Sequence, residues 1–236
     1  MVAIIDYEVG NLFSLMSSLN YVGIENKLTD RENIIKKSDA IILPGVGAFR
    51  DAIEKLEKKN CGILKETLIE ESKKGKIILG ICLGMQMAVV EFARDVLGYK
   101  DANSEEFDEA STCKVIHIME DQIHIANKGG TMRLGAYPCN ILKNTLAEEV
   151  YKTNKISERH RHRFEYNNKY REEMEKAGLI CSGLSPDGNL VEIVELKSHP
   201  YFIASQFHPE FKSRPDKPHP LFVSLVKAAK ANVNNV

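Results

Sequence analysis

The stretch Lys76-Ile-Ile-Leu-Gly-Ile-Cys82-Leu-Gly84-Met-Gln86 decides the fold of this chain. Residues Ile77 to Ile81 are apolar apart from one glycine, which predicts a buried central strand. Cys82 follows at once, and Met85 to Ala93 then has helical character. This order of strand, sharp turn and helix is that of a nucleophile elbow, with cysteine in the place of serine.

Two features of this turn suggest that Cys82 is a nucleophile. Gly80 and Gly84 carry no Cβ, so the backbone can take strained dihedrals and the strand and helix can approach closely. The thiol is expected at a helix N-terminus, where the peptide dipoles favour thiolate over thiol. A free cysteine is more often a small buried core residue, so the pentapeptide alone leaves both interpretations open.

The bulk properties exclude several classes of protein. The 236 residues fit one α/β domain or two small ones, and 43% hydrophobic residues can form a sizeable core. The net charge of −1, without a basic stripe among aromatics, argues against nucleic-acid binding. No apolar run is long enough to cross a membrane, and the N-terminus lacks signal-peptide features. Five cysteines without a CxxC pair suggest neither disulfides nor zinc, so we expect a cytoplasmic, reduced protein.

Strands and helices alternate up to about Val96, which predicts a parallel sheet with crossover helices. The predicted strands are Val2–Ile5, Ile24–Leu28, Asp39–Leu43 and the elbow strand. The predicted helices are Asn11 to about Tyr21, Arg31–Lys36, Phe49–Lys58, Ile63–Lys73 and the elbow helix.

The second half of the chain changes character. Gly98–Glu109 is polar and acidic, so no regular element is expected there. Further strands are predicted at Lys114–Met119, Gly130–Tyr137, Gly178–Leu184, Leu190–Leu196 and Tyr201–Phe207, before a closing helix from His219 to Asn232. No repeat or linker interrupts the chain, so we expect a single domain over residues 1–236.

A thiolate needs a base, and the base needs an acceptor that orients it. Gln206-Phe-His208-Pro-Glu210 supplies both just past the last predicted strand. Catalytic groups collect at the carboxyl ends of parallel strands, which places His208 on the same sheet edge as Cys82. His-Pro-Glu alone could equally be a surface turn. Together with the elbow it predicts a Cys82-His208-Glu210 triad.

An oxyanion that develops during acyl transfer needs preorganised N–H donors. One candidate is the backbone of Leu83, directly after the nucleophile. The other is Gly45-Val46-Gly47, which follows a buried strand and whose small residues would let an N–H point into the site. A plain strand-to-helix turn is the alternative for this segment.

Arg159-His160-Arg161-His162-Arg163 is the densest cationic run. It is either a solvated loop or a clamp for a carboxylate, which arginine binds bidentately. A metal site at His160 and His162 is disfavoured because no cysteine or carboxylate pair lies in ligand spacing. Gly129-Gly130 lacks the spacing of a phosphate-binding loop. We therefore expect no metal and no cofactor.

The elbow heptapeptide from Gly80 to Gln86, together with Gln206-Phe-His-Pro-Glu210, resembles the class I (triad) glutamine amidotransferases. These enzymes hydrolyse the side-chain amide of glutamine and pass the ammonia to a synthase active site. The resemblance implies a three-layer, flavodoxin-like α/β fold. Its central sheet would be mostly parallel, with flanking helices and a small antiparallel addition.

The resemblance is divided between two members of the family. Residues 1–76, through the strings Ile4–Leu12 and Leu43–Phe49, resemble the glutaminase subunit of imidazole glycerol phosphate synthase. Residues 77–236, from about Leu79 on, resemble the glutaminase domain of CTP synthase. The strings that carry the second match are Ala102–Phe107, Gly129–Tyr137, Glu158–Arg163 and Gln206–Pro215. This division predicts a chimera joined at the elbow, constructed or, alternatively, a natural recombinant.

The resemblance also implies roles for individual residues. Cys82 would be the nucleophile, His208 the base and acid, and Glu210 its orienting partner. Gln86, Glu106 and Arg163 would contact L-glutamine, with the Leu83 backbone beside them. Gly45 and Val46 would belong to the oxyanion strand.

The partner of such a domain would be a cyclase subunit or the amidoligase domain of CTP synthase. The amidoligase domain that precedes the glutaminase in CTP synthase is not part of this sequence, so we expect that the chain cannot make CTP alone. The resemblance to the imidazole glycerol phosphate synthase subunit implies that the oxyanion strand rearranges when a partner binds, so we expect low unaided turnover. Two alternatives stay open: another γ-glutamyl cysteine hydrolase, and a catalytically silent scaffold that docks a partner.

Overall fold

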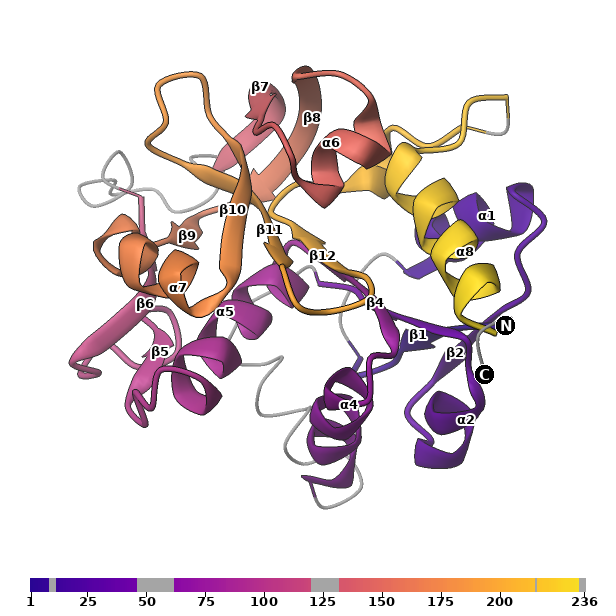
Figure 1. Cartoon of the computed structure of the whole chain (residues 1–236), viewed down its shortest axis with the longest axis horizontal. Coiled ribbons are helices and arrows are strands. Elements are labelled where there is room, and N and C mark those ends of the chain that lie inside the picture. Colours follow the sequence, from indigo (N-terminus) through magenta and orange to yellow (C-terminus); the bar gives the residue numbers. More distant parts are fainter. Residues whose placement is uncertain (9–11, 46–61, 120–131, 215, 234–236) are drawn as a thin grey trace.

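A nine-stranded sheet forms the centre of the computed structural model, which describes residues 1–8, 12–45, 62–119, 132–214 and 216–233. The strand order is β2-β1-β3-β4-β12-β11-β10-β7-β8 (Figure 1). The parallel strands are β1 (Val2–Ile5), β2 (Asn26–Thr29), β3 (Ala40–Leu43), β4 (Ile77–Ile81) and β12 (Phe202–Ser205). The antiparallel extension comprises β11 (Val191–Leu196), β10 (Leu179–Leu184), β7 (Arg133–Ile141) and β8 (Lys155–His162).

Helices cover both faces of this sheet. One face carries α1 (Leu12–Tyr21), α6 (Leu146–Tyr151) and α8 (Pro220–Val233). The other carries α2 (Glu32–Lys37), α4 (Ile63–Lys73), α5 (Leu83–Asp95) and α7 (Arg171–Ala177). A three-stranded sheet of β5 (Ala102–Ser104), β6 (Cys113–Ile118) and β9 (Phe164–Tyr166) lies beside α5. The expected three-layer fold is confirmed.

Side-chain alternation along the strands builds the two cores. On β4, Ile77, Leu79 and Ile81 join the core under α1 and α8, whereas Ile78 joins the core under α4 and α5. Successive side chains of a strand point to opposite faces, so a strand covered on both sides is apolar throughout. This is why the elbow strand reads as a continuous apolar run.

Several elements differ from the sequence-based expectation. The segment Gly98–Glu109 contains β5, a strand of three residues that are all buried. The first four residues of the cationic run are part of β8, in which Glu158, His160 and His162 are buried. Polar residues at buried positions hide the alternation of apolar and polar residues by which a strand is predicted. Elements as short as α6, β9 and α7 contain too few residues to show a hydrophobic periodicity. The expected helix Phe49–Lys58 lies outside the described residues.

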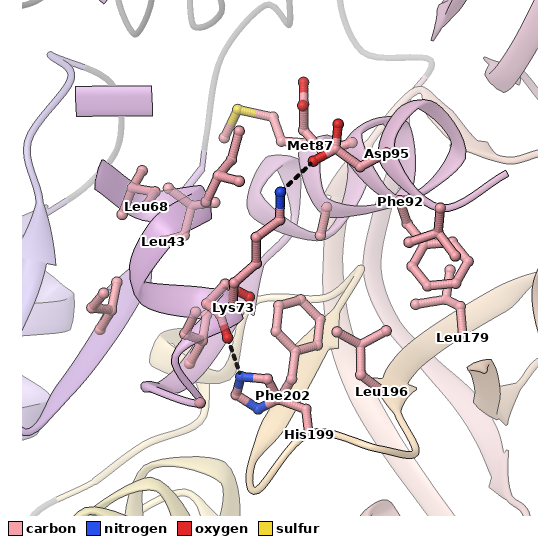
Figure 2. Close-up of a pocket in the computed structure, with 18 of the residues that line it drawn as sticks. Leu43, Leu68, Lys73, Met87, Phe92, Asp95, Leu179, Leu196, His199 and Phe202 are labelled. Carbon is pink, nitrogen blue, oxygen red and sulfur yellow. Dashed lines mark hydrogen bonds and ion pairs between the residues drawn. The ribbon is translucent and has the colours of Figure 1, made fainter. Parts of the chain in front are cut away.

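A cavity of about 470 Å³ lies between α4, α5 and the sheet (Figure 2). Its lining is mostly apolar and includes Leu43, Met87 and Phe202. Lys73 of α4 and Asp95 of α5 form an ion pair of 3.4 Å at this cavity. None of the predicted triad residues lines it. Among the described residues, no helix has both the length and the apolar composition needed to cross a membrane.

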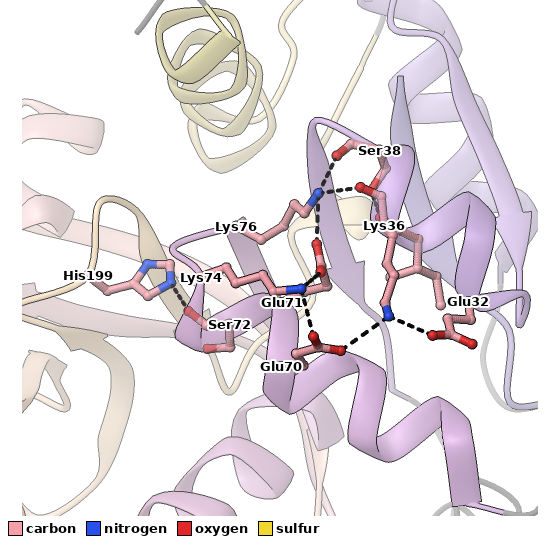
Figure 3. Close-up of polar contacts among 10 residues, drawn as sticks. Glu32, Lys36, Ser38, Glu70, Glu71, Ser72, Lys74, Lys76 and His199 are labelled. Atoms are coloured by element: carbon pink, nitrogen blue, oxygen red, sulfur yellow. Dashed lines mark hydrogen bonds and ion pairs between the residues drawn. The ribbon is translucent and has the colours of Figure 1, made fainter. Parts of the chain in front are cut away.

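A polar network anchors the C-terminal end of α4 to the start of β4 (Figure 3). The buried carboxylate of Glu71 accepts from Lys76 at 2.9 Å and from Lys74 at 3.1 Å. Lys76 also donates to the carbonyl of Ser38, at 2.8 Å, which joins α4 to the segment before β3. Burial alone would raise the pKa of Glu71, but the two lysines outweigh it and lower that pKa.

Replacing Glu71 by Gln should lower the free energy of unfolding by about 1–3 kcal/mol at pH 7, because the buried network loses its negative charge and one of its two acceptor oxygens. A carboxyl with a lowered folded pKa stabilises the protein above its unfolded pKa and loses that contribution as pH falls through the folded value. The difference from wild type should therefore shrink below about pH 4.5. Urea unfolding of both proteins at pH 7 and at pH 3.5 measures this difference in the free energy of unfolding. Glu70→Gln, at a half-exposed neighbour whose ion pairs are screened by solvent, is the matched control and should cost much less stability than Glu71→Gln. Equal losses for the two variants would contradict the account.

Candidate functional site

Cys82 occupies a strained backbone position between β4 and α5. Its φ is 51° and its ψ −103°, a conformation that side-chain-bearing residues rarely adopt. Its N–H donates to the Ser205 carbonyl at 2.6 Å, and its carbonyl accepts from Met85 and Gln86 at the start of α5. The turn is thus held from the neighbouring strand on one side and from the helix on the other.

The glycines around this turn are required by close contact. A Cβ on Gly84 would lie 2.2 Å from the carbonyl oxygen of Leu43, and a Cβ on Gly80 would lie 2.8 Å from Ala204 Cβ. A Cβ on Gly45 would lie 2.2 Å from Leu83 Cβ and 2.9 Å from Leu83 N. The segment after β3 therefore packs against the first residue of α5.

This contact brings two of the expected oxyanion elements together. Leu83 begins α5, so its N–H belongs to the first turn, whose donors have no intrahelical acceptor. Gly45 lies directly beside it. Val46 and Gly47, the other residues of the expected oxyanion strand, lie outside the described residues.

His208 and Glu210 follow β12, the parallel neighbour of β4. Ser205 pairs with Ile81, which brings the chain after β12 to the edge where Cys82 lies. His208 is fully buried, its Nδ1 lies 2.8 Å from Glu210 Oε1, and its ring stacks on Phe211. The residue pair expected to form the base and its orienting partner is therefore in contact.

Charge near His208 outweighs its burial. Burial would lower the pKa of this imidazole, but the negative charge of Cys82 and the Glu210 carboxylate raise it, to about 10. Nε2 is buried without a hydrogen-bond partner among the described residues. Cys82 is the largest of the causes that raise this pKa, so the imidazole carries its proton at neutral pH.

A tyrosine that the sequence analysis did not single out also lies near the thiol. The Tyr7 hydroxyl is fully buried and donates to the carbonyl of Pro44, the residue before Gly45. Burial and the charge of Cys82 raise its pKa well above the ordinary value. Tyr7 thus tethers the start of the Gly45 segment from β1. A tyrosine just after a strand was the available signal.

The expected glutamine-contacting residues lie on three elements. Gln86 is buried in the first turns of α5 and donates to the Phe164 carbonyl at 2.9 Å. Arg163 joins β8 to β9 immediately before Phe164, and Glu106 follows β5. Because β5 and β9 both pair with β6, Glu106, two residues beyond β5, and Arg163, one residue before β9, lie next to the small sheet beside α5. Both side chains are half-buried.

The cationic run is neither a solvated loop nor a uniform clamp. Arg159 and Arg161 point outward, whereas His160 and His162 point inward on β8. His162 Nδ1 lies 3.1 Å from the Phe164 carbonyl, and His160 Nδ1 lies 3.0 Å from His162 Nε2. Burial is the main cause that lowers their pKa values, to about 2 for His160 and about 3 for His162.

Glu192 completes a set of donors that could hold a metal ion with the two histidines. Their ligand atoms lie within 4.8 Å of one another, and all three residues are buried. However, Arg133 Nη1 already lies 2.7 Å from Glu192 Oε1, and its charge also lowers the pKa of both histidines. A metal ion would have to enter beside a guanidinium in a buried site, which disfavours it.

Comparisons with known proteins agree on one family. The family model "Glutamine amidotransferase class-I" matches residues 3–228. The chain is 56% identical over 206 residues to a CTP synthase of Fibrobacter succinogenes, covering 86% of this chain and 35% of that protein. A CTP synthase of Methanosphaera stadtmanae is 48% identical over 233 residues, with 94% and 42% covered. The chain therefore spans well under half the length of these curated relatives.

Similarity to solved structures agrees with this family assignment. The Trypanosoma brucei CTPS glutaminase domain with bound acivicin has a TM-score of 0.76 and 31% identity, covering 98% of this chain and 93% of that one. A putative GMP synthase subunit from Thermoplasma acidophilum has a TM-score of 0.68 at 15% identity, which shows a shared fold alone.

Replacing Gly84 by Ala should destabilise the protein by about 1–3 kcal/mol, because the new Cβ has no space beside the Leu43 carbonyl. Thermal unfolding measures the loss. Ala88→Ser, one turn further along α5, should cost only a few tenths of a kcal/mol by helix propensity. A Gly84→Ala protein as stable as wild type would show that the elbow and β3 are not in close contact.

Proposed function

The chain belongs to the class I glutamine amidotransferase family, and on that premise we propose that it hydrolyses L-glutamine to L-glutamate and ammonia. One observation carries the proposal: a cysteine in a strained strand-to-helix turn lies at the same sheet edge as a buried His–Glu pair. A nucleophile, a base and an orienting carboxylate are the parts that acyl transfer needs.

In the first step the Cys82 thiolate attacks the side-chain amide carbon of glutamine. The amide oxygen then carries negative charge, which the N–H of Leu83 and a donor of the Gly45 segment would stabilise. Losing one such donor typically costs about 10²–10³-fold in rate. The raised pKa of His208 keeps a proton on the imidazole at neutral pH, ready for the leaving nitrogen.

His208 then gives this proton to the nitrogen, the C–N bond breaks, and ammonia leaves a γ-glutamyl thioester on Cys82. A water molecule, deprotonated by His208, attacks the thioester carbon. Glutamate leaves and the thiolate is restored, while Glu210 holds the imidazole through Nδ1 during both proton transfers.

Glu106, Arg163 and Gln86 are proposed to hold the substrate. A carboxylate at Glu106 suits the α-ammonium of glutamine, and the guanidinium of Arg163 suits its α-carboxylate. Their support is the match of these positions to the family pattern and the location of Glu106 and Arg163 at ends of β5 and β9, the latter in contact with Gln86.

We propose that the ammonia passes to a synthase partner of the CTP synthase type, because the curated relatives quoted above carry that name. A cyclase partner and a chimeric origin have the motifs of residues 1–76 as their support. The Methanosphaera stadtmanae match covers 94% of the chain, so it includes most of those residues and favours a CTP synthase-type origin throughout. The cytoplasmic location stays a prediction.

A single domain over residues 1–236 is part of the proposal. Its support is that one nine-stranded sheet contains β1, β2 and β3 from the first part of the chain together with β4, β7, β8, β10, β11 and β12. The other two candidates, a different γ-glutamyl hydrolase and a silent scaffold, make different predictions in the assays below.

Cys82→Ser should abolish measurable glutamate release, because a hydroxyl without a strong base is a far weaker nucleophile than a thiolate. Cys113→Ser, at another buried free cysteine, should retain it. Release is measured with and without a CTP synthase amidoligase domain or a cyclase subunit. Undiminished release by Cys82→Ser would refute the assignment. Faster hydrolysis of γ-glutamyl peptides than of glutamine would favour the peptidase alternative.

Glu210→Gln should reduce kcat about 10²-fold or more and move the alkaline limb of the kcat–pH profile to lower pH. The reason is that the carboxylate is one of the groups that raise the pKa of His208, and without it the proton is lost earlier as pH rises. Glu173→Gln, at a carboxylate on α7 that accepts from Tyr99, is the control and should leave the profile unchanged. An unchanged profile in Glu210→Gln would show that Glu210 does not act on His208.

A further inference from the structure

We propose that Gln206 is a thiolate-positioning residue, whose side-chain amide donates a hydrogen bond to Cys82 Sγ. This inference rests on the proposed function only in its consequence for turnover. Its physical basis is the geometry around the sulfur, where Gln206 Nε2 lies 3.6 Å from Cys82 Sγ. Gln206 is 1% exposed and Cys82 5% exposed, so water contributes little at this contact.

The direction of this hydrogen bond follows from its neighbours. A backbone carbonyl can only accept, so the Gln86 side-chain atom 2.9 Å from the Phe164 oxygen must be the amide nitrogen. The same nitrogen lies 3.2 Å from the next amide, so the Gln206 atom that faces it must be an acceptor, Oε1. The remaining atom of Gln206, which faces the sulfur, is therefore Nε2.

The Phe164 carbonyl, at which this series of hydrogen bonds begins, is itself held in place. His162 Nδ1 lies 3.1 Å from the Phe164 oxygen, so the carbonyl accepts from His162 as well as from Gln86. The backbone around Gln206 is fixed too, because its N–H donates to the Glu192 carbonyl at 2.8 Å. The amide can thus be neither flipped nor withdrawn without losing several buried hydrogen bonds.

Such a donor discriminates between the two forms of the sulfur. Hydrogen bonds to an ionised acceptor are about twice as strong as neutral ones, and a neutral thiol is a weak acceptor. Gln206 therefore favours the thiolate and holds it at one position. His208 contributes charge from its own side, whereas Gln206 contributes a directed dipole.

The test is the pH dependence of Cys82 alkylation by iodoacetamide, followed on the Cys82 peptide by mass spectrometry. Gln206→Met keeps the length of the side chain but has no donor. Its alkylation rate should reach half its maximum about one pH unit higher than in wild type, so that below both midpoints it should be alkylated about tenfold more slowly. Gln206→Glu should be slower still, because its carboxylate repels the thiolate. The limiting rate at high pH should be similar in all three proteins.

Asn103→Leu is the matched control, because it also removes a buried amide but on β5. Its pH profile should be that of wild type, and thermal unfolding checks that each variant is folded.

Wild-type-like profiles for both Gln206 variants would overturn the inference, as would a wild-type Cys82 that is not alkylated at pH 7. Equal slowing by Met and Glu would also overturn it, because a purely structural role does not depend on charge. Alkylation requires no glutamine turnover, so a chain that shows the shift but releases no glutamate, with or without an amidoligase domain or a cyclase subunit, would sink the proposed function and leave this inference standing.

Discussion

The 2.6 Å hydrogen bond from Cys82 N–H to the Ser205 carbonyl ties together the two strands on which the site depends. It extends the β4–β12 ladder by one step past the last paired residues, Ile81 and Ser205. Beyond this bond both segments leave the sheet: the one after β4 enters the elbow, and the one after β12 leads to His208. The register of two parallel strands thus sets the distance between Cys82 and His208, although 126 positions separate them in the sequence.

The strained backbone at Cys82 persists because the structure around it leaves no alternative. Residues in rarely populated dihedral regions cost about 1–3 kcal/mol each and need surrounding contacts to hold them. Here those contacts are the strand bond on one side, two helical N–H groups on the other, and the close approach of Leu43 to Gly84. The gain is a thiol that projects from the end of the sheet at the beginning of a helix.

Much of this arrangement could be predicted from the sequence. The elbow strand has the predicted bounds, Ile77–Ile81, because a strand covered on both faces leaves a continuous apolar run. Strand β8 was missed for the opposite reason, since its buried positions hold Glu158, His160 and His162 and its apolar pattern is absent. The contact of His208 with Glu210 could be anticipated because the two residues are close in sequence. The role of Gln206 could not, because the orientation of its amide is set through Gln86 by a carbonyl on β9, and these contacts span 120 and 78 positions.

Polar groups buried near the thiol set the hydrogen bonding and the charges of the site. Gln86, Gln206, His162 and the Phe164 carbonyl are connected in one hydrogen-bonded path that ends at the sulfur. Burial, with the charge of Arg133 beside them, lowers the pKa values of the two histidines on β8 and keeps them uncharged, while His208 keeps its proton. A charged imidazole beside the sulfur favours the thiolate form of Cys82.

The central claim, that this sulfur attacks glutamine, is tested most directly by trapping the covalent intermediate. The chain is incubated with L-glutamine, quenched in acid and digested, and its peptides are weighed by mass spectrometry. The account predicts a γ-glutamyl adduct on the Cys82 peptide that disappears when hydroxylamine cleaves thioesters. Glutamate release without any adduct on Cys82, or with an adduct on another cysteine, would contradict it.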